Sequence, residues 1–521
     1  MNLITFEQSK HIDSKTIQKG VEEKILMGLA AQSAFITMLH HNFISKDNIY
    51  LFLCGSGNNG GDGLALAYLI LGSRIVSKNQ IYIFLKDKPK SVSSQFYYEM
   101  LLKNHLMIYP LEDIYNLNLI NDKKIILIEG LLGSGQKNLP RSPYKEILEF
   151  IKKLKEKLKE KLIHIALDIP AGLSEEYDAF NEKEFLNFFG LSVPDYIFNF
   201  GLKKLVLLHP LIHAQSKIFV LPCGFDPEEQ SQIVKQQLEF IEWDLLNDFF
   251  YFKKRPYEHK YQSGYGWLFA GSNNMEGAAI LSAKSFFYSG GGILHLIHFS
   301  NHRDLFLKIE PSIIYHHFEE WKENYINLKL PQCIVIGPGL SKNDIEIYQS
   351  DFIKFFQFLV SINHYPIIIL DAYATTLILD KNFPEQLKPF TIITPHLGEW
   401  KLLKGEFPYL VSNWQYIEEL YKTLGVSILI KGSISFFIPS YYFKERKVFV
   451  WKYQNPHLSV AGSGDVLTGI MMSYFSKNNH NSYKNIANGM NLILSLQNKI
   501  AEKHSTAHDQ INNLKNLINN L

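Results

Sequence analysis

Short apolar runs alternate with longer amphipathic segments along most of the chain. In the first part, turn residues follow each apolar run, and these runs cover residues 48–54, 80–85, 124–130, 162–170 and 195–200. Their length and their content of β-branched and aromatic residues predict strands. Residues 145–162 instead repeat apolar positions at helical spacing among lysines and glutamates, which predicts a solvated crossover helix. Strands that alternate with helices in this way predict a parallel sheet.

This alternation stops once and then restarts. Residues 221–243 are polar and contain prolines, and we interpret them as a linker. New strand-like runs follow at residues 265–272, 291–299, 332–340, 366–373, 390–400 and 426–433. Leucine and isoleucine spacing over residues 508–521 predicts a final helix. A chain of 521 residues is also too long for one ordinary core. We therefore expect an α/β fold in two domains.

Composition narrows the class of protein. Hydrophobic residues make up 46% of the chain and charged residues 20%, the range of folded soluble proteins. Lys and Arg total 53 against 51 Asp and Glu, so no global field favours nucleic acid or an anionic membrane. The distant Cys54, Cys223 and Cys333 support neither a disulfide framework nor a zinc site. Without a signal-like start or a long apolar span, we expect a cytoplasmic protein with small-molecule partners.

Three turns rich in glycine or acid follow predicted strands of the first domain. Residues 55–63, GSGNNGGDG, contain the G-x-G-x-x-G pattern of dinucleotide-binding turns and add two amides and Asp62. Residues 129–140, EGLLGSGQKNLP, form the second turn, and Asp168 ends a strand in LDIPAGL. Each turn by itself is typical of an ordinary strand end or a helix cap. Because open α/β sheets bind ligands at the carboxyl ends of their strands, the three together predict a ligand site.

The second domain contains a glycine-flanked acid, Asp465, at the start of an apolar helix over residues 462–475. Backbone N–H groups and the helix dipole form an anion site there, and an acid among them can deprotonate a hydroxyl that attacks a phosphoryl group. The competing interpretation is that Asp465 is only an N-terminal helix residue, which the helix dipole favours. No Walker sequence is present. Lys431 in IKGS and His396 in TPHLGEW follow predicted strands upstream.

The motifs of both domains, in the order in which they occur along the chain, resemble those of the two-domain NAD(P)H-hydrate repair enzymes. In that family an epimerase is fused to an ADP-dependent dehydratase. The epimerase-like stretches are ILMGLAAQSA, GSGNNGGDGLALA, EGLLGSGQKNLP, LDIPAGL and FNFGLKKLVLLHP. The dehydratase-like stretches are RPYEHKYQSGYGWLFAGSNNMEGAAILSAKSFFYSGGGI, IGPGL, LDAYA, TPHLGEW, IKGS and AGSGDVLTGI. The resemblance covers nearly the whole chain. It implies a Rossmann-like three-layer N-terminal domain over residues 1–225 and a ribokinase-like α/β C-terminal domain over residues 235–521.

The resemblance implies that the dinucleotide is bound as a damaged substrate and not as a redox cofactor. Water at C6 of the nicotinamide ring of NADH or NADPH gives R and S hydrates, which the first domain would interconvert. The second domain would phosphorylate the S hydrate from ADP, with Mg²⁺, and phosphate would then leave. We expect hydrated NADH or NADPH and ADP as partners, no nucleic acid or membrane, and a homo-oligomer.

The resemblance also implies roles for individual residues. Asp168 is the catalytic acid/base of the first domain and Asp465 the base of the second. Hydrate contacts fall on Asn58, Asn59, Gly60, Gly61, Asp62, Gly133, Ser134, Gly135, Gln136, Lys137, Asn138, Leu139, Ala278, Gly339 and His396. Nucleotide contacts fall on Lys431, Gly432, Ser433, Ile434, Ser435 and Gly464. Potassium-ligand positions fall on Asn59, Glu129 and Ala171.

This sequence departs from the family pattern at four positions. Glu129 and Ala171 stand where the family usually has Asp and Ser, and a lost hydroxyl weakens a site for a hard cation, which prefers oxygen ligands. Tyr373 replaces a second Asp, and Ser341 replaces a common Gly. Two alternatives stay open: a ribokinase-like vitamin or sugar kinase that makes a stable phosphate ester, and a dehydratase whose first domain is a non-catalytic scaffold.

Overall fold

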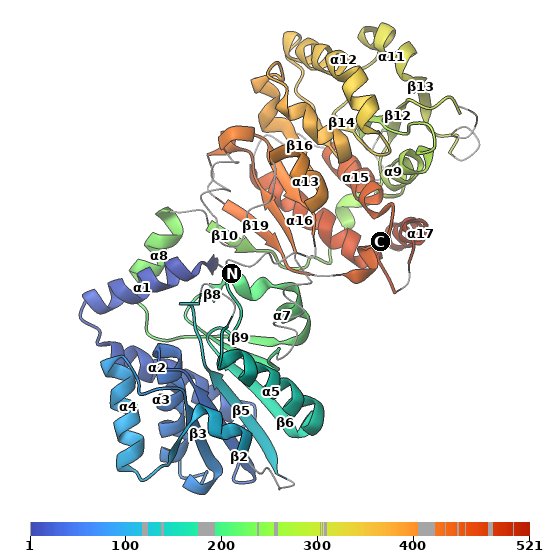
Figure 1. Cartoon of the computed structure of the whole chain (residues 1–521). Coiled ribbons are helices and arrows are strands. Elements are labelled where there is room, and N and C mark those ends of the chain that lie inside the picture. The colour runs from blue at the N-terminus through green and yellow to red at the C-terminus, as the bar shows by residue number, and fades with distance from the viewer. Residues whose placement is uncertain are drawn as a thin grey trace. The chain divides into compact units, whose positions relative to one another are not determined.

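The computed structural model divides into two compact units, one with the described residues up to Glu239 and one with those from Phe240 onward (Figure 1). Both units are α/β, which confirms the predicted fold class. None of the described helices has the length and apolarity that a bilayer crossing requires. The structure describes the chain except residues 1, 117–122, 137–139, 176–192, 237–238, 255–258, 303, 305, 307–309, 405–421, 433, 445–446, 454, 478–482 and 504.

The first unit is built, within its described residues, on a seven-stranded sheet whose neighbouring strands all run parallel. Across the sheet the order is β4 (Ile108–Pro110), β3 (Ile81–Leu85), β2 (Asn48–Cys54), β5 (Lys124–Gly130), β6 (Leu162–Leu167), β7 (Tyr196–Phe200) and β9 (Lys217–Leu221). The predicted strands at residues 48–54 and 124–130 coincide with β2 and β5. Both strands are buried almost throughout, and an uninterrupted apolar run is typical of a strand covered on both faces.

Helices cover both faces of this sheet. Along β2 the side chains alternate, so that Leu51 and Leu53 pack with α5 (Tyr144–Leu158) while Phe52 and Cys54 pack with the opposite helix layer. That opposite layer contains α2 (Glu23–His40), α3 (Asn58–Gly72) and α4 (Val92–Lys103). The crossover helix predicted over residues 145–162 is α5, with a short 3₁₀ turn after it. The first unit is therefore a three-layer sandwich, which confirms the fold that the family resemblance implies.

The strand order of this sheet reverses between β2 and β5. From β2 the chain runs outward through β3 to β4, and it then returns to β5 on the other side of β2. Residues 55–60 follow β2, and residues 131–136 follow β5. Such a reversal opens a crevice at the carboxyl ends of the strands, which is where ligands bind in folds of this kind.

Smaller elements complete the first unit. The strands β1 (Asn2–Ile4) and β8 (Lys203–Lys204) pair in parallel, and the helices are α1 (Phe6–Gln18), α7 (Pro210–Gln215) and α8 (Pro227–Gln236). The two units divide between Glu239 and Phe240, inside the predicted linker of residues 221–243, but α8 and β10 (Glu239–Glu242) give most of this segment regular structure. Pro227 is the first residue of α8, a position where proline starts a helix rather than breaking one.

The second unit contains a mixed sheet. Its order is β13 (Ile314–His317), β12 (Ile293–His298), β11 (Tyr265–Phe269), β14 (Cys333–Ile336), β15 (Ile367–Leu370), β16 (Thr391–Ile393), β17 (Ser427–Ile430), β18 (Ser435–Ile438), β19 (Lys447–Trp451) and β10. Neighbours from β13 to β17 run parallel, whereas β18 is antiparallel to both β17 and β19. The strand order reverses between β11 and β14, so the crevice expected here also lies at the carboxyl ends of the strands.

Helices lie on both faces of the second sheet as well. Trp267 and Phe269 of β11 contact Trp321 of α11 (Phe318–Asn324) and Phe355 of α12 (Lys342–Ser361). Between them in sequence, Leu268 belongs to the cluster on the opposite face. The helices that contribute to that cluster are α9 (Glu276–Tyr288), α15 (Ser463–Phe475), α16 (Tyr483–Ile500) and α17 (Ala507–Asn519). The final helix predicted near residues 508–521 is α17.

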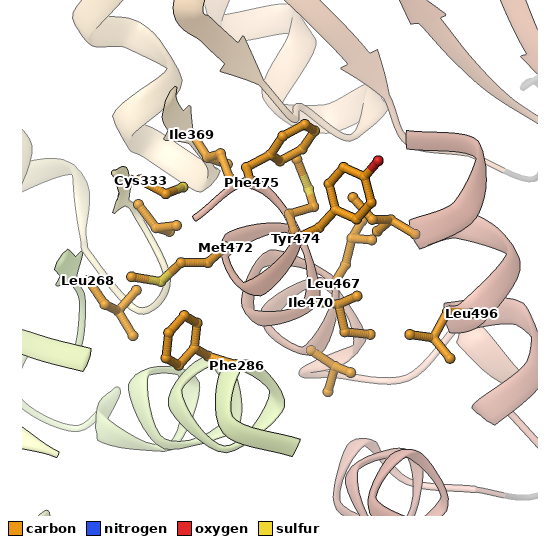
Figure 2. Close-up of a cluster of buried hydrophobic side chains, with 14 of the residues drawn as sticks. Leu268, Phe286, Cys333, Ile369, Leu467, Ile470, Met472, Tyr474, Phe475 and Leu496 are labelled. Carbon is orange, nitrogen blue, oxygen red and sulfur yellow. The ribbon is translucent and has the colours of Figure 1, made fainter. Parts of the chain in front are cut away.

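The helix α15 is the most deeply embedded element of that layer. Figure 2 shows its side chain Met472 among Leu268, Phe286 and Cys333, which come from two strands and α9. From Val466 to Phe475 every residue of α15 is buried. This packing fixes the start of the helix, where Asp465 lies.

Candidate functional site

A cavity of about 610 Å³ lies where the strands of the first sheet end. All three predicted turns contribute to its wall, so the structure brings them together. The hydrate-contact positions among its lining residues are Asn58, Asn59, Gly60, Asp62, Gly133, Ser134, Gly135 and Gln136, and Asp168 lines it as well. Gly61 is absent from the lining, and the positions Lys137, Asn138 and Leu139 lie outside the described residues.

The glycines after β2 allow a close backbone approach. A Cβ on Gly60 would lie 1.9 Å from the carbonyl oxygen of Gly55, and one on Gly61 would lie 2.1 Å from Oγ of Ser94 in α4. Any side chain at these two positions would clash. Gly61 therefore packs the first turn of α3 against α4, while Gly60 lies at the cavity wall.

Gln136 joins the second turn to the third. Its Nε2 donates to the carbonyl oxygen of Pro170 at 3.2 Å, and its Oε1 accepts from the N–H of Gly172 at 2.8 Å. These two bonds hold the turn after β5 against the turn that follows Asp168.

Asp168 has a backbone φ of 54°, a left-handed conformation that is uncommon for a residue with a side chain. Its Oδ1 accepts from Asn199 Nδ2 at 3.1 Å, from the Phe200 N–H at 3.2 Å and from Lys204 Nζ at 2.6 Å. Within the described residues no donor reaches Oδ2. The carboxylate is thus oriented through one oxygen while the other is left for a ligand.

Asp13, Glu23 and Lys204 also line this cavity, although they were not among the predicted site residues. Burial raises the pKa of Asp13 to about 6; Lys204 opposes this shift, and Asp168 adds to it. Burial, with help from Asp168 and Asp13, holds the pKa of Asp62 well above its usual range. Glu23 accepts from Asn58 Nδ2 at 2.8 Å. No local pattern marks Asp13 or Glu23, because only the packing of α1 and α2 brings them to the cavity.

The three positions that were predicted to bind potassium are placed as follows. Asn59 donates through Nδ2 to the carbonyl oxygen of Leu132 at 2.6 Å, while its buried Oδ1 has no partner in the described structure. Glu129 is buried, accepts from the N–H of Ala171 at 3.0 Å and lies 3.5 Å from His164 Nε2. Ala171 offers no side-chain ligand. Asn59 and Glu129 therefore carry side-chain oxygens of the kind that a cation prefers, whereas Ala171 could offer only its backbone carbonyl.

A second group of polar side chains gathers where the strands of the second sheet end. Lys431 follows β17 and donates from Nζ to Asp371 Oδ1 at 2.6 Å. Thr394, after β16, donates to the same oxygen at 2.6 Å. His396 and Lys431 are paired through their backbones, and the Lys431 N–H donates to the Pro395 carbonyl at 2.9 Å. Adjacent strands thus bring together turns that are distant in sequence.

Asp465 completes this group from the start of α15. Gly462 caps the helix with a φ of 89°, in the left-handed region that suits glycine. Burial and the neighbouring Asp371 raise the pKa of Asp465 to about 7, and Lys431 lowers it. A Cβ on Gly464 would lie 3.8 Å from Lys431 Nζ, so the lysine head group reaches the helix start. Asp465 and Lys431 were predicted site residues, whereas Asp371 was not.

The remaining predicted positions of the second unit are placed as follows. Gly339 has a φ of 68°, and its Cβ would lie 3.0 Å from that of Ala278, so these two predicted hydrate-contact positions are neighbours. His396 is largely exposed, and its Nε2 lies 3.2 Å from Glu399 Oε1. Gly432, Ile434 and Ser435 follow Lys431, with Ser435 Oγ donating to the Gly432 carbonyl at 3.3 Å, while Ser433 lies outside the described residues.

One departure from the family pattern has a local explanation. Ser341 precedes α12, and its Oγ accepts from the Asp344 N–H at 3.2 Å while its own N–H donates to the Asp344 carboxylate at 2.7 Å. This reciprocal pair is a capping box, a strong helix start that glycine could not make.

Two family models match the chain. The YjeF-related protein N-terminus model matches residues 23–206, and the model described as NAD(P)H-hydrate dehydratase matches residues 267–520. A bifunctional NAD(P)H-hydrate repair enzyme of Dictyoglomus turgidum is 27% identical over 91% of this chain and 89% of its own. An NAD(P)H-hydrate epimerase of Lentilactobacillus buchneri is 30% identical over 33% of this chain and 73% of its own. An ADP-dependent (S)-NAD(P)H-hydrate dehydratase of Staphylococcus aureus is 28% identical over 45% of this chain and 81% of its own.

Proposed function

The chain belongs to the family of bifunctional NAD(P)H-hydrate repair enzymes, and we propose that it interconverts the R and S hydrates of NADH and NADPH and dehydrates the S hydrate with ADP. We assign the epimerase to residues 1–225 and the ribokinase-like dehydratase to residues 235–521. The observation that carries this proposal is that one chain contains two separate groups of converging polar side chains. One is the cavity around Asp168, and the other is the cluster of Asp371, Lys431 and Asp465.

In the first unit, the cavity would hold the hydrate between the turns after β2 and β5. Glu23 orients Asn58 for this contact, and Gln136 keeps the two neighbouring turns together. Lys10 and Lys90 line the cavity and are exposed, which suits them to the anionic diphosphate of a dinucleotide. Asp168, held by Lys204, would exchange a proton at the hydrated ring through its unengaged oxygen.

In the second unit, Asp465 would take the proton from the C6 hydroxyl of the S hydrate. The hydroxyl oxygen then bonds to the terminal phosphorus of ADP, and the bond from that phosphorus to the bridging oxygen breaks. The N–H groups of Gly462 to Gly464 and the nearby Lys431 would stabilise the transferring phosphoryl group. Phosphate leaves C6 with its bonding electrons, and loss of a proton from C5 restores the dihydronicotinamide.

Mg²⁺ would neutralise charge on the ADP phosphates when bound. Glu399 carries a carboxylate in this cluster, and burial raises the pKa of that carboxylate despite the neighbouring Lys431. It is the type of oxygen ligand that Mg²⁺ requires, and it would therefore hold the ion.

We also propose that K⁺ binds in the first unit at Asn59 and Glu129. The buried Asn59 Oδ1, without a hydrogen-bond partner in the described structure, is the group that fits a cation best. At Ala171 only the backbone carbonyl could join them. When bound, K⁺ supplies positive charge beside the buried Glu129 carboxylate.

The test uses the intact chain with pure R hydrate and with pure S hydrate. Recovery of the reduced-nicotinamide absorbance from S hydrate should require ADP and give no stable phosphorylated hydrate; accumulation of such an ester would favour a kinase. R hydrate with ADP should be consumed faster than it isomerises spontaneously, and Asp168→Ala should return consumption to the spontaneous rate. If the unaltered chain shows no acceleration at either low or high potassium, the first unit is a scaffold.

Two further assignments accompany this function. We place the protein in the cytoplasm, because Cys54, Cys223 and Cys333 are free, buried thiols, and a reducing compartment keeps thiols in that state. Formation of a homo-oligomer stays a prediction, and light scattering of the purified chain measures it.

A further inference from the structure

The cavity of the first unit contains more carboxyl groups than one acid/base needs. Asp13, Asp62 and Asp168 line it together with a single buried lysine, Lys204. They come from α1, α3 and the turn after β6, so no single element explains why they meet. Lys204 Nζ lies 2.6 Å from Asp168 Oδ1. Lys204 is therefore not a direct partner of Asp13 or Asp62.

Asp13 has no structural role that accounts for its place. Within the described residues, no hydrogen bond or ion pair reaches its carboxyl, although it is partly buried against the cavity. A partly buried carboxyl without a partner costs stability, so a purely structural residue at this place would be apolar or paired. The position of the Asp13 carboxyl therefore indicates that it interacts with a ligand.

We propose that Asp13 is a second catalytic carboxyl of the first unit, which exchanges a proton with the C6 oxygen of the hydrate on one face of the ring while Asp168 serves the other. This inference rests on the proposed epimerisation. Inversion at C6 requires an oxygen to leave from one face of the ring and an oxygen to be added on the opposite face. One acid/base group is therefore needed on each face.

The chemistry balances with water alone. Asp13 gives its proton to the C6 hydroxyl, the C–O bond breaks, and water leaves while the ring nitrogen lone pair forms a C6=N1 bond. A water molecule attacks C6 from the opposite face, the C6=N1 electrons return to nitrogen, and Asp168 takes the proton that this water releases. The reverse reaction exchanges the two roles. No oxidant or co-reactant is needed, and solvent resets the two carboxyls.

Asp13 suits this role better than Asp62 does. A group that must both give and accept a proton works best when its pKa lies near the working pH. Burial, opposed by Lys204, raises the pKa of Asp13 to about 6, whereas the pKa of Asp62 is held well above its usual range. This raised pKa makes Asp62 the poorer candidate for a group that both gives and accepts a proton.

Several charged or titratable groups face Asp13 and must be considered in any pH study. They are Lys10 on its own helix, Glu23 on α2, Asp62 on α3, Asp168 after β6, Lys204 on β8 and Cys223 after β9. Since the proton-donating form of Asp13 is lost as the pH rises through about 6, the rate from R to S should fall above that pH. Glu7, an exposed carboxyl of the same helix, offers a matched control.

The experiment measures epimerisation of R hydrate in the intact chain, with S-hydrate dehydration as the internal standard. Asp13→Asn should lower epimerisation by about 10²-fold. It should also remove the decline above pH 6 and leave dehydration unchanged, while Glu7→Gln keeps both activities and the profile. Asp13→Glu should restore part of the rate. Epimerisation in Asp13→Asn within twofold of Glu7→Gln, or an unchanged pH profile, would overturn the inference.

Two further outcomes are decisive. If Asp13→Asn lowers the thermal midpoint, the Asp13→Glu variant provides the test instead. A pH profile of epimerisation that is displaced from that of the unaltered chain then supports the inference. A profile that superimposes on that of the unaltered chain overturns it. Absence of epimerisation in the unaltered chain would overturn the proposed function itself, and with it this inference.

Discussion

Lys431 Nζ lies 2.6 Å from Asp371 Oδ1, although the two residues are 60 positions apart in the chain. Asp371 is only 5% exposed, and it also accepts from Thr394 at 2.6 Å. Although burial opposes it, Asp371 and Glu399 raise the pKa of Lys431, so the lysine stays charged. This pair places a fixed positive charge beside the start of α15, where a phosphoryl group would be transferred.

Replacing Lys431 with Met should both destabilise the second unit and weaken nucleotide use. Removing one partner leaves a buried carboxylate uncompensated, which costs about 3 kcal/mol. The urea midpoint of the second unit should fall accordingly. The matched control is Lys342→Met, since Lys342 and Glu346 form an exposed pair worth less than about 1 kcal/mol. Equal midpoints for the two variants would contradict the role of the Lys431 pair.

Asp465→Asn should keep ADP binding but reduce dehydration of the S hydrate by roughly 10²-fold or more, because it removes the general base. The base is the ionised carboxylate, and the pKa of Asp465 is raised to about 7. In the unaltered chain, kcat/KM should therefore fall as the pH drops below about 7 and level off above it. A pH-independent kcat/KM between 5 and 8, or full turnover in Asp465→Asn, would exclude this role.

Gly60→Ala should disrupt the first turn of α3. The new methyl group would lie 1.9 Å from the Gly55 carbonyl oxygen, so the backbone must move at a cost of about 2 kcal/mol or more. Gly72→Ala is the control at the far end of the same helix, where a Cβ meets nothing within 4 Å. Gly72→Ala should keep or slightly raise the thermal midpoint. A thermal midpoint for Gly60→Ala that matches that of Gly72→Ala would show that the first turn of α3 tolerates a side chain at this position.

Potassium should stabilise the first unit. A ligand at ten times its Kd adds about 1.4 kcal/mol to the free energy of unfolding. The thermal midpoint of the first unit should therefore rise when choline is replaced by K⁺. Asn59→Ala should abolish this rise, because it removes the buried Oδ1, while Asn58→Ala should keep it, since Asn58 bonds Glu23 instead. If K⁺ raises the thermal midpoint equally in both variants, Asn59 does not bind the ion.

The sequence by itself determined the strands, the turns and the start of α15. Strands β2 and β5 were predicted because both faces of each are buried, and this gives an uninterrupted apolar run. The start of α15 was predicted because glycines precede an apolar helix that is buried from Val466 onward. These signals are local, since each depends on the burial of one element and on the turn next to it.

Only the tertiary structure decided which polar side chains meet. Lys204 reaches Asp168 across 36 positions, and Asp13 reaches the same cavity from α1. Sequence periodicity shows which residues of an element are buried, but it does not show which element packs beside another. That depends on the order of the strands and on the helices that cover their ends. The second carboxyl of the cavity and the partner of Lys431 therefore became visible only when the sheets were assembled.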